Sequence, residues 1–217
     1  MPTVFCSRPE VTKEIILQRC KFYMDVQLWP LHGRLMPEQW LSNFNNDELP
    51  YAVQLLSSFL FMSEAVIDNL LIAAYQKLSR EVVSAARSYE EGLILWEQFT
   101  SSTLVSWIPG ERPNFSDSGI MFVRKARQIL GVPESNIVSP EEAIRRISFG
   151  SNQSVIFFDD FVGSGEQCIT AWDLVYPSAG NISFHNLAVD LKKKFYYCPL
   201  VCTQYGSPAI PADAVTT

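Results

Sequence analysis

The stretch SVIFFDDFVGSGEQ, residues 154–167, combines a short apolar run, two adjacent carboxylates and a glycine-rich turn. Val155–Phe158 is continuously apolar and rich in β-branched and aromatic residues, which is typical of a strand buried on both faces of a parallel sheet. Parallel α/β sheets bind ligands at the carboxyl ends of their strands, and Asp159 and Asp160 follow at that end. The stretch therefore predicts an α/β fold with a ligand site at this edge.

The turn after the acid pair has the composition of an anion site. Gly163 and Gly165 permit backbone angles that let successive N–H groups converge on one anion, and Ser164 adds a hydroxyl. A helix expected from about residue 166 to 175 directs its positive end at the same point. Carboxylates repel a phosphate but suit ribose hydroxyls or a hydrated divalent cation. A ribose-phosphate ligand is the favoured interpretation; a solvated acidic turn with a plain connector is the alternative.

Residues 157–165 resemble the phosphoribosyl diphosphate (PRPP) signature of type I phosphoribosyltransferases. That signature is an apolar strand followed by two acidic residues, two apolar residues, a small residue, Thr or Ser, and Gly. The resemblance implies that Asp159 and Asp160 form the catalytic pair, contact the ribose 2′- and 3′-hydroxyls, and help to hold Mg²⁺ through water or substrate. It also implies that the 5′-phosphate binds to a loop made of Val162, Gly163, Ser164, Gly165, Glu166 and Gln167.

A second, broader resemblance concerns the whole chain. The motif together with the helical first half looks like the divergent phosphoribosyltransferase-like proteins of bacterial anti-phage systems, including those associated with retrons. This resemblance implies an anti-phage effector that acts on nucleotides by phosphoribosyl transfer or N-glycosidic cleavage.

Two departures from the type I signature leave catalysis open. Gly163 stands where 6-oxopurine enzymes carry an Asp general base, and Gln167 replaces the usual final Thr of the loop. The alternative is therefore a non-catalytic, nucleotide-binding regulatory or interaction subunit of a bacterial defence complex. Whether the chain is an enzyme is not decided by its sequence.

A second loop is predicted to face the same edge of the sheet. Ser116, Asp117, Ser118 and Gly119 lie between a predicted strand and its helix. By its position in the family this loop would hold the pyrophosphate through Ser116, Ser118 and Gly119, with support from two arginines one turn apart, Arg124 and Arg127. The alternative is an ordinary helix cap and a solvated helix face.

Composition narrows the class of protein. The 217 residues are 47% hydrophobic and 18% charged, which indicates a filled core rather than disorder. The net charge of −6 offers no evident nucleic-acid surface. No apolar run approaches the roughly 20 residues that span a bilayer, and the amino terminus lacks a signal-peptide pattern, so we expect a cytoplasmic protein with no membrane partner. Five cysteines without Cys-x-x-Cys spacing are interpreted as small core residues rather than a zinc site.

The chain changes character near residue 101. Residues 1–100 are predicted to form an all-helical region suited to a protein partner. Within it, Trp40 and Phe44 would line a base pocket or partner groove, or simply close a helix end. Residues 101–217 are predicted to form a parallel, Rossmann-like phosphoribosyltransferase core with right-handed crossovers. The carboxyl-terminal residues 204–217 look frayed. The expected helices are 11–25, 38–44, 50–78, 82–100 and 140–147, with a further helix that follows the polar loop ending at Ser118 and stops at Gly131. The expected strands are 103–108, 136–139, 155–158 and 195–203.

Overall fold

The computed structural model describes residues 12–30, 33–109, 118–212 and 214–216. Contacts divide the chain into two compact units, Met1–Ile67 and Asp68–Thr217. The division falls inside α4 (Glu64–Val82), whereas the boundary drawn at residue 100 marks the change from helices to strands. Most of α4 and all of α5 (Tyr89–Ser102) are therefore grouped with the sheet.

The first unit contains α1 (Lys13–Asp25), α2 (Pro37–Leu41) and α3 (Leu49–Ser58). Thr12 caps α1 by accepting a hydrogen bond from the Ile15 N–H at 3.4 Å. The apolar stripes of α1 and α3 pack on each other around one core, made of Ile16, Cys20, Met24, Trp29, Leu41, Ala52, Val53 and Leu56.

The single helix expected over residues 50–78 is wrong. Helix α3 ends at Ser58, Phe59 takes an extended conformation, and α4 begins at Glu64. The Phe59 ring packs edge-on against Trp29 with 5.5 Å between ring centroids, and the Ser63 hydroxyl accepts a hydrogen bond from the Val66 N–H at the start of α4. Tertiary packing and a new cap thus interrupt an apolar pattern that is compatible with one long helix.

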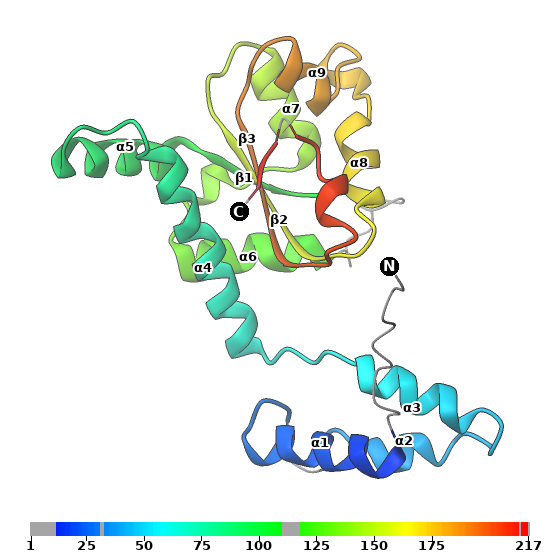
Figure 1. Ribbon diagram of the computed structural model, residues 1–217. Coiled ribbons are helices and arrows are strands. Elements are labelled where there is room, and N and C mark those ends of the chain that lie inside the picture. Colours follow the sequence, from blue (N-terminus) through cyan, green and yellow to red (C-terminus); the bar gives the residue numbers. More distant parts are fainter. Residues whose placement is uncertain (1–11, 31–32, 110–117, 213, 217) are drawn as a thin grey trace, which may run out of the picture. The chain divides into compact units, whose positions relative to one another are not determined.

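The second unit is a mixed α/β fold built on a parallel sheet (Figure 1). Its strands lie side by side in the order in which they occur in the chain, and each pair is parallel. The strands are β1 (Leu104–Trp107), β2 (Val155–Val162), β3 (Phe195–Cys202) and β4 (Ala214–Thr216). The carboxyl ends of β1, β2 and β3 therefore meet at one edge.

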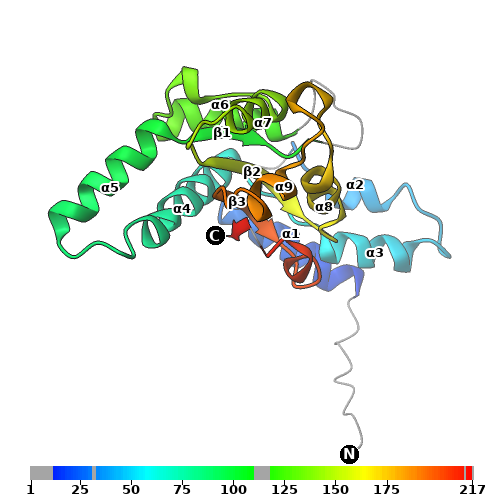
Figure 2. The ribbon, with the colours of Figure 1, turned by 90° about the horizontal axis from the view of Figure 1, so that it is seen from above.

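Helices cover both faces of this sheet. Val155 and Phe157 share a core with α7 (Pro140–Ser148), α8 (Glu166–Asp173) and α9 (Phe184–Val189). Phe158 faces the other way, where its ring lies 6.5 Å from that of Tyr75 on α4. Helix α6 (Ser118–Leu130) contacts β1 and β2. Figure 2 shows α8 and α9 on one side of β2 and β3 and α4 on the other. Two covered faces explain why β2 has a continuously apolar start.

The short strand expected at residues 136–139 is also wrong. Residues Glu134–Asn136 form a 3₁₀ turn, and only Ile137 makes an isolated bridge to Val105. The Asn136 side-chain amide donates to the Ser101 carbonyl at 2.8 Å, which anchors the turn. The next helix, α7, starts where its Ser139 cap predicts.

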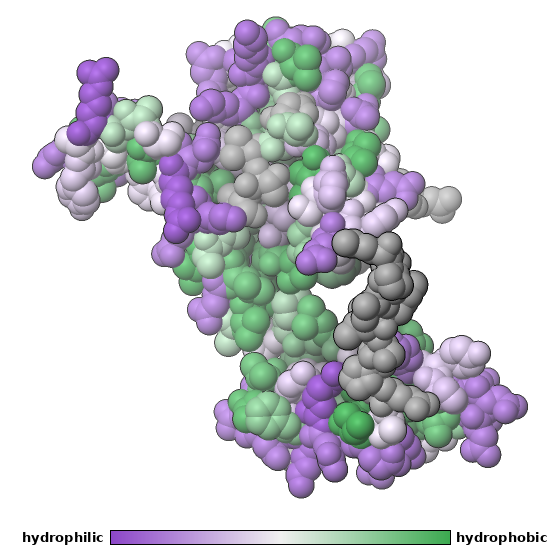
Figure 3. Space-filling view, in the orientation of Figure 1, coloured by the Kyte–Doolittle hydropathy of each residue, from purple (hydrophilic) through white to green (hydrophobic). Residues whose placement is uncertain are grey.

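The surface of the second unit includes one unusually exposed helix, α5, which has no buried residue. Hydrophilic and hydrophobic side chains are mixed along it in the space-filling view (Figure 3). Within the described part of the chain, no helix has the length and apolar character needed to cross a membrane. The expectation that the cysteines are core residues is confirmed for Cys20, Cys168 and Cys198, whereas Cys202 is exposed and Cys6 lies outside the described residues.

Candidate functional site

Strand β2 runs past its apolar start to Val162, so Asp159 and Asp160 lie within the strand rather than after it. The β2–β3 ladder continues through them, pairing Asp159 with Pro199 and Phe161 with Val201. Successive strand residues point to opposite faces of a sheet, so the two carboxylates face different layers. Adjacent acids in the sequence therefore occupy two different environments.

Asp159 is buried, with 8% of its surface exposed. Its Oδ2 accepts a 2.5 Å hydrogen bond from the Tyr197 hydroxyl, and its Oδ1 accepts one of 3.0 Å from the Asp160 N–H. Tyr197 pairs with Phe157 in the ladder, which makes it the diagonal neighbour of Asp159 on the same face. Both carboxylate oxygens are thus already engaged by the protein.

Burial raises the pKa of Asp159 to about 6, against the lowering effect of the Tyr197 hydrogen bond. Burial likewise raises the pKa of Tyr197, and the neighbouring Asp159 charge adds to that effect. Cys168 on α8 lies beside this pair, and burial raises its pKa to about 12. At neutral pH the site therefore holds a carboxylate in a poorly solvated position next to a neutral phenol and a neutral thiol.

Asp160 is only partly buried, and its Oδ1 accepts a 2.9 Å hydrogen bond from the Phe161 N–H. The Asp160 side chain is thus less buried than that of Asp159, and its local hydrogen bond restrains its rotamer. Of the acid pair, Asp160 is the group that a solvent-borne ligand reaches without rearrangement.

The glycine turn carries β2 directly into α8. Gly165 adopts φ +83°, a left-handed conformation that favours glycine, and it immediately precedes the helix. Ser164, Glu166 and Gln167 are exposed, and the Ser164 hydroxyl accepts a long 3.4 Å bond from the Glu166 N–H. The turn thus presents polar groups at the positive end of an eight-residue helix, as an anion site requires.

The segment after β3 packs against this turn, and Ala214–Thr216 pair with β3 as strand β4. The expectation that residues 204–217 are frayed is therefore wrong for the described residues of that stretch. The Thr203 N–H donates to the Val162 carbonyl at 2.9 Å, and the Thr203 hydroxyl donates to the Gly163 carbonyl at 2.5 Å. A Cβ added to Gly165 would lie 2.7 Å from the Ala209 Cβ. The turn is therefore supported by a segment about 40 residues away in the sequence.

The second predicted loop is only partly described. Ser116 and Asp117 lie outside the described residues, and Ser118 is the first residue of α6. Gly119 is buried, and a Cβ there would lie 2.6 Å from the Trp107 Cβ at the end of β1. Gly119 thus allows α6 to pack closely on Trp107. Its contact with a pyrophosphate stays a prediction. The start of α6 follows the same sheet edge as the glycine turn.

The two arginines of α6 lie beyond its first turn. Arg127 pairs with Glu134 at 3.1 Å, and both arginines line a cavity of about 230 Å³ with that glutamate. Their predicted support of a pyrophosphate stays a prediction.

The described residues offer few side chains that could hold a metal ion. No group of three His, Cys, Asp or Glu side chains in the described residues is arranged to hold a metal ion. The acid pair itself supplies one engaged and one accessible carboxylate. This donor set fits a Mg²⁺ ion that arrives on a pyrophosphate and touches the protein through water.

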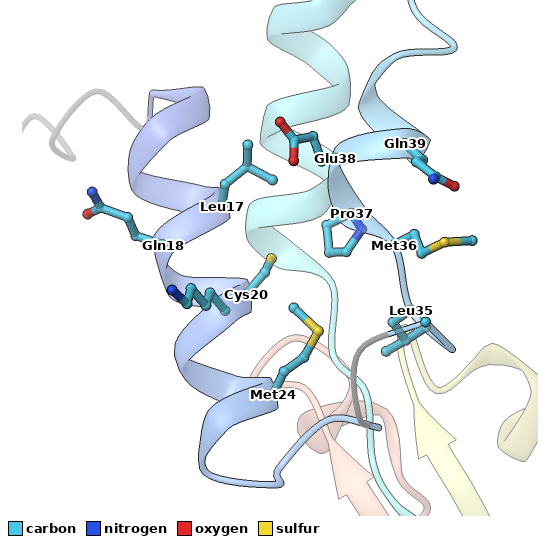
Figure 4. A pocket seen from close by; sticks show the side chains of 11 residues that line it. Leu17, Gln18, Cys20, Met24, Leu35, Met36, Pro37, Glu38 and Gln39 are labelled. Carbon is cyan, nitrogen blue, oxygen red and sulfur yellow. The ribbon is translucent and has the colours of Figure 1, made fainter.

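Two further cavities lie in the helical unit. One, of about 450 Å³, separates α1 from the segment before α2. Figure 4 shows Leu17, Cys20 and Met24 of α1 on one wall and Leu35 to Pro37 on the other. The second, of about 430 Å³, is lined by Trp40 and other apolar groups, while the Trp40 ring also packs on Phe44 at 4.8 Å. Trp40 is thus both a wall of a cavity and part of a helix end.

Sequence reasoning missed Tyr197, Thr203 and Gly206, which complete the site from β3 and its exit. A signal for Thr203 did exist, because it is the last residue of the strand predicted over 195–203 and therefore lies at the ligand-binding edge. The signal for Tyr197 is weaker: it is a residue with a polar hydroxyl within an otherwise apolar strand. Gly206 shows no signal, because its role is a close approach between distant backbones.

Comparison with known proteins gives one match. Residues 37–215 match the PRTase-CE family, a span that includes β1 to β3, the acid pair and the glycine turn. No curated protein and no solved structure matches the chain.

Proposed function

Because this chain belongs to the PRTase-CE family, a phosphoribosyltransferase-like family, we propose that it binds PRPP or a nucleotide ribose-phosphate where β2 meets α8. The observation that carries the proposal is the left-handed Gly165, which places an exposed polar turn between a buried strand and a helix start. The 5′-phosphate would lie on the backbone and side chains of residues 162–167.

The ribose would contact the acid pair unequally. Asp160 is accessible and would accept from a ribose hydroxyl directly. Asp159 would first exchange its Tyr197 hydrogen bond for one from the ribose, which keeps the buried carboxylate satisfied in both states. Ribose binding is therefore coupled to a rearrangement at Tyr197.

If the chain is an enzyme, the reaction breaks the bond between ribose C1 and its leaving group. In phosphoribosyl transfer the pyrophosphate leaves and an acceptor nitrogen bonds to C1; in N-glycosidic cleavage a base leaves and water bonds to C1. Positive charge develops on the sugar in both cases, and the nearby carboxylates would stabilise it. A Mg²⁺ ion bound with PRPP would neutralise charge on the pyrophosphate. Ser116, together with Ser118 and Gly119 at the start of α6, would hold that pyrophosphate.

A second candidate function is a nucleotide-binding regulatory subunit without catalysis, in a bacterial anti-phage complex. Two observations favour it. Gly163 offers no general base at the turn, and both oxygens of Asp159 are engaged by the protein. A protein partner would then contact the amino-terminal helical region, where apolar side chains such as Leu55 are exposed around a cavity.

Calorimetry with PRPP and Mg²⁺ tests the shared part of both proposals. Wild-type protein should bind, and Asp160→Asn should bind at least tenfold more weakly because a charge-assisted hydrogen bond is lost. Asp190→Asn, an exposed carboxylate at the end of α9, is the matched control and should bind as wild type. Pyrophosphate released with an acceptor, or base released from a nucleotide, identifies an enzyme. Binding without either product identifies a sensor, and no binding by the wild type rejects the proposal.

A further inference from the structure

Thr203 makes two hydrogen bonds with one hydroxyl group. The Oγ1–H donates to the Gly163 carbonyl at 2.5 Å, and Oγ1 accepts from the Gly206 N–H at 2.9 Å. The first bond crosses from the exit of β3 to the glycine turn after β2. The second fixes the direction of the hydroxyl, because an oxygen that accepts from Gly206 must direct its proton elsewhere. The Thr203 side chain is therefore held in the orientation that engages the turn.

This bond determines how one peptide of the turn is oriented. The Gly163–Ser164 peptide is planar and trans, since the described chain contains no cis peptide. In such a peptide the C=O and the following N–H point in opposite directions. The Gly163 carbonyl points toward Thr203, so the Ser164 N–H points away from it, out of the packed side of the turn.

The segment after β3 packs closely against this side of the turn. A Cβ added to Gly206 would lie 2.4 Å from the Gly163 carbonyl oxygen and 3.0 Å from the Val162 Cγ1. The main chains of the two segments are thus in direct contact around that carbonyl. Gly163, by contrast, has no side chain to restrain its own rotation. The restraint on the peptide comes from Thr203 and its surroundings.

We propose that Thr203 is the positioning residue of the phosphate loop. Its hydroxyl holds the Gly163–Ser164 peptide so that the Ser164 N–H is presented to the 5′-phosphate beside the N–H groups at the start of α8. This inference rests on the proposed ribose-phosphate site and adds the residue that preorganises it. Preorganised donors bind an anion without a free-energy cost of reorientation, so losing the preorganisation should weaken phosphate binding.

Substitutions at position 203 separate positioning from packing. Thr203→Val keeps the shape and removes the hydroxyl, and Thr203→Ser keeps the hydroxyl and removes a methyl group. We expect Thr203→Val to bind ribose 5-phosphate about tenfold or more weakly by calorimetry, the effect of one misplaced hydrogen bond to a charged group. Thr203→Ser should bind within about twofold of wild type. Thr203→Cys, a weak donor of similar size, should lie between them and serves if the valine variant does not fold.

A second readout follows the Ser164 amide itself. Titration of ¹⁵N-labelled protein with inorganic phosphate should shift the Ser164 amide resonance in the wild type and in Thr203→Ser, and much less in Thr203→Val. A purely structural role of Thr203 would lower the melting temperature of Thr203→Val and leave its affinity and this shift unchanged.

The possible results distinguish the role of Thr203 from the existence of the ribose-phosphate site. A wild type that binds ribose 5-phosphate and a folded Thr203→Val that binds it equally well overturn the role of Thr203 and leave the proposed site intact. A wild type that binds neither ribose 5-phosphate nor phosphate overturns both. Weak binding by the valine variant with recovery in the serine variant supports the positioning role.

Discussion

The two halves of the SVIFFDDFVGSGEQ motif are held in different ways. The acid half lies inside the sheet, where Asp159 is buried and its partner Tyr197 is a diagonal neighbour in the β2–β3 ladder. The glycine half lies outside the sheet and depends on Thr203 and Gly206, about 40 residues later. The acid half therefore contains a buried carboxylate, Asp159, whose ionisation is unfavourable. The turn, in contrast, is stabilised by contacts from a distant segment.

The largest effect on stability is expected where the segment after β3 contacts the glycine turn. Gly206→Ala should lower the free energy of unfolding by about 2–4 kcal/mol, because the new methyl group meets the Gly163 carbonyl and Val162. Urea unfolding measures the change. Gly92→Ala on α5, where the added Cβ finds ordinary contact distances, is the control and should be neutral or slightly stabilising. A neutral Gly206→Ala would show that the two segments are not in contact.

Asp159→Asn should act in the opposite direction on stability. The pKa of this carboxyl is raised from 3.8 to about 6, which corresponds to about 1–3 kcal/mol of destabilisation by the ionised form at pH 7.5. The amide removes that charge, and its oxygen can accept from the Asp160 N–H while its NH₂ group donates to the Tyr197 hydroxyl oxygen. The free energy of unfolding should therefore rise while PRPP binding falls. Urea unfolding and calorimetry check the two changes. A destabilised variant would mean that the carboxylate is better solvated than the structure indicates.

The pH dependence of the same pair sharpens this prediction. The folded-state pKa of Asp159 lies above the unfolded value, so the folded chain retains a proton that the unfolded chain has already lost. The stabilising contribution is complete below about pH 3.8 and is lost as the pH rises through about 6. The difference in unfolding free energy between Asp159→Asn and wild type should therefore grow from near zero at pH 4 to its full value at pH 7.5. If this difference in unfolding free energy stayed constant with pH, the stabilisation by Asp159→Asn would come from packing and not from the removed charge.

The smallest effect on stability is expected from Tyr197, the hydrogen-bond partner of Asp159. Tyr197→Phe removes the hydroxyl that donates to Asp159, so the pKa of Asp159 should rise further and the free energy of unfolding at pH 7.5 should fall by about 1–2 kcal/mol. Below pH 5, where Asp159 is protonated, the loss should be smaller. Carboxyl ¹³C shifts measured against pH follow the pKa directly. Tyr205→Phe, an exposed tyrosine on the segment after β3, is the control.

Several ends of helices and strands can be predicted from local patterns. The Ser139 cap, the Gly131 that ends α6 and the apolar start of β2 are each recognised from a few neighbouring residues. Strand β2 was nevertheless predicted to stop at Phe158, because adjacent aspartates are depleted in strands. The ladder to β3 carries the strand four residues further. Pairing between strands overrides the local preference.

What the amino-acid sequence alone determined is a glycine turn between a buried strand and a helix, since that depends on glycine conformation and apolar patterning within fourteen residues. The tertiary structure alone decided which acid is buried, because alternation and register place Asp159 beside Tyr197 and Asp160 at the other face. It also brought Thr203 and Gly206 to the turn. Contacts between segments about 40 residues apart depend on the parallel order of β2 and β3, which no local pattern contains.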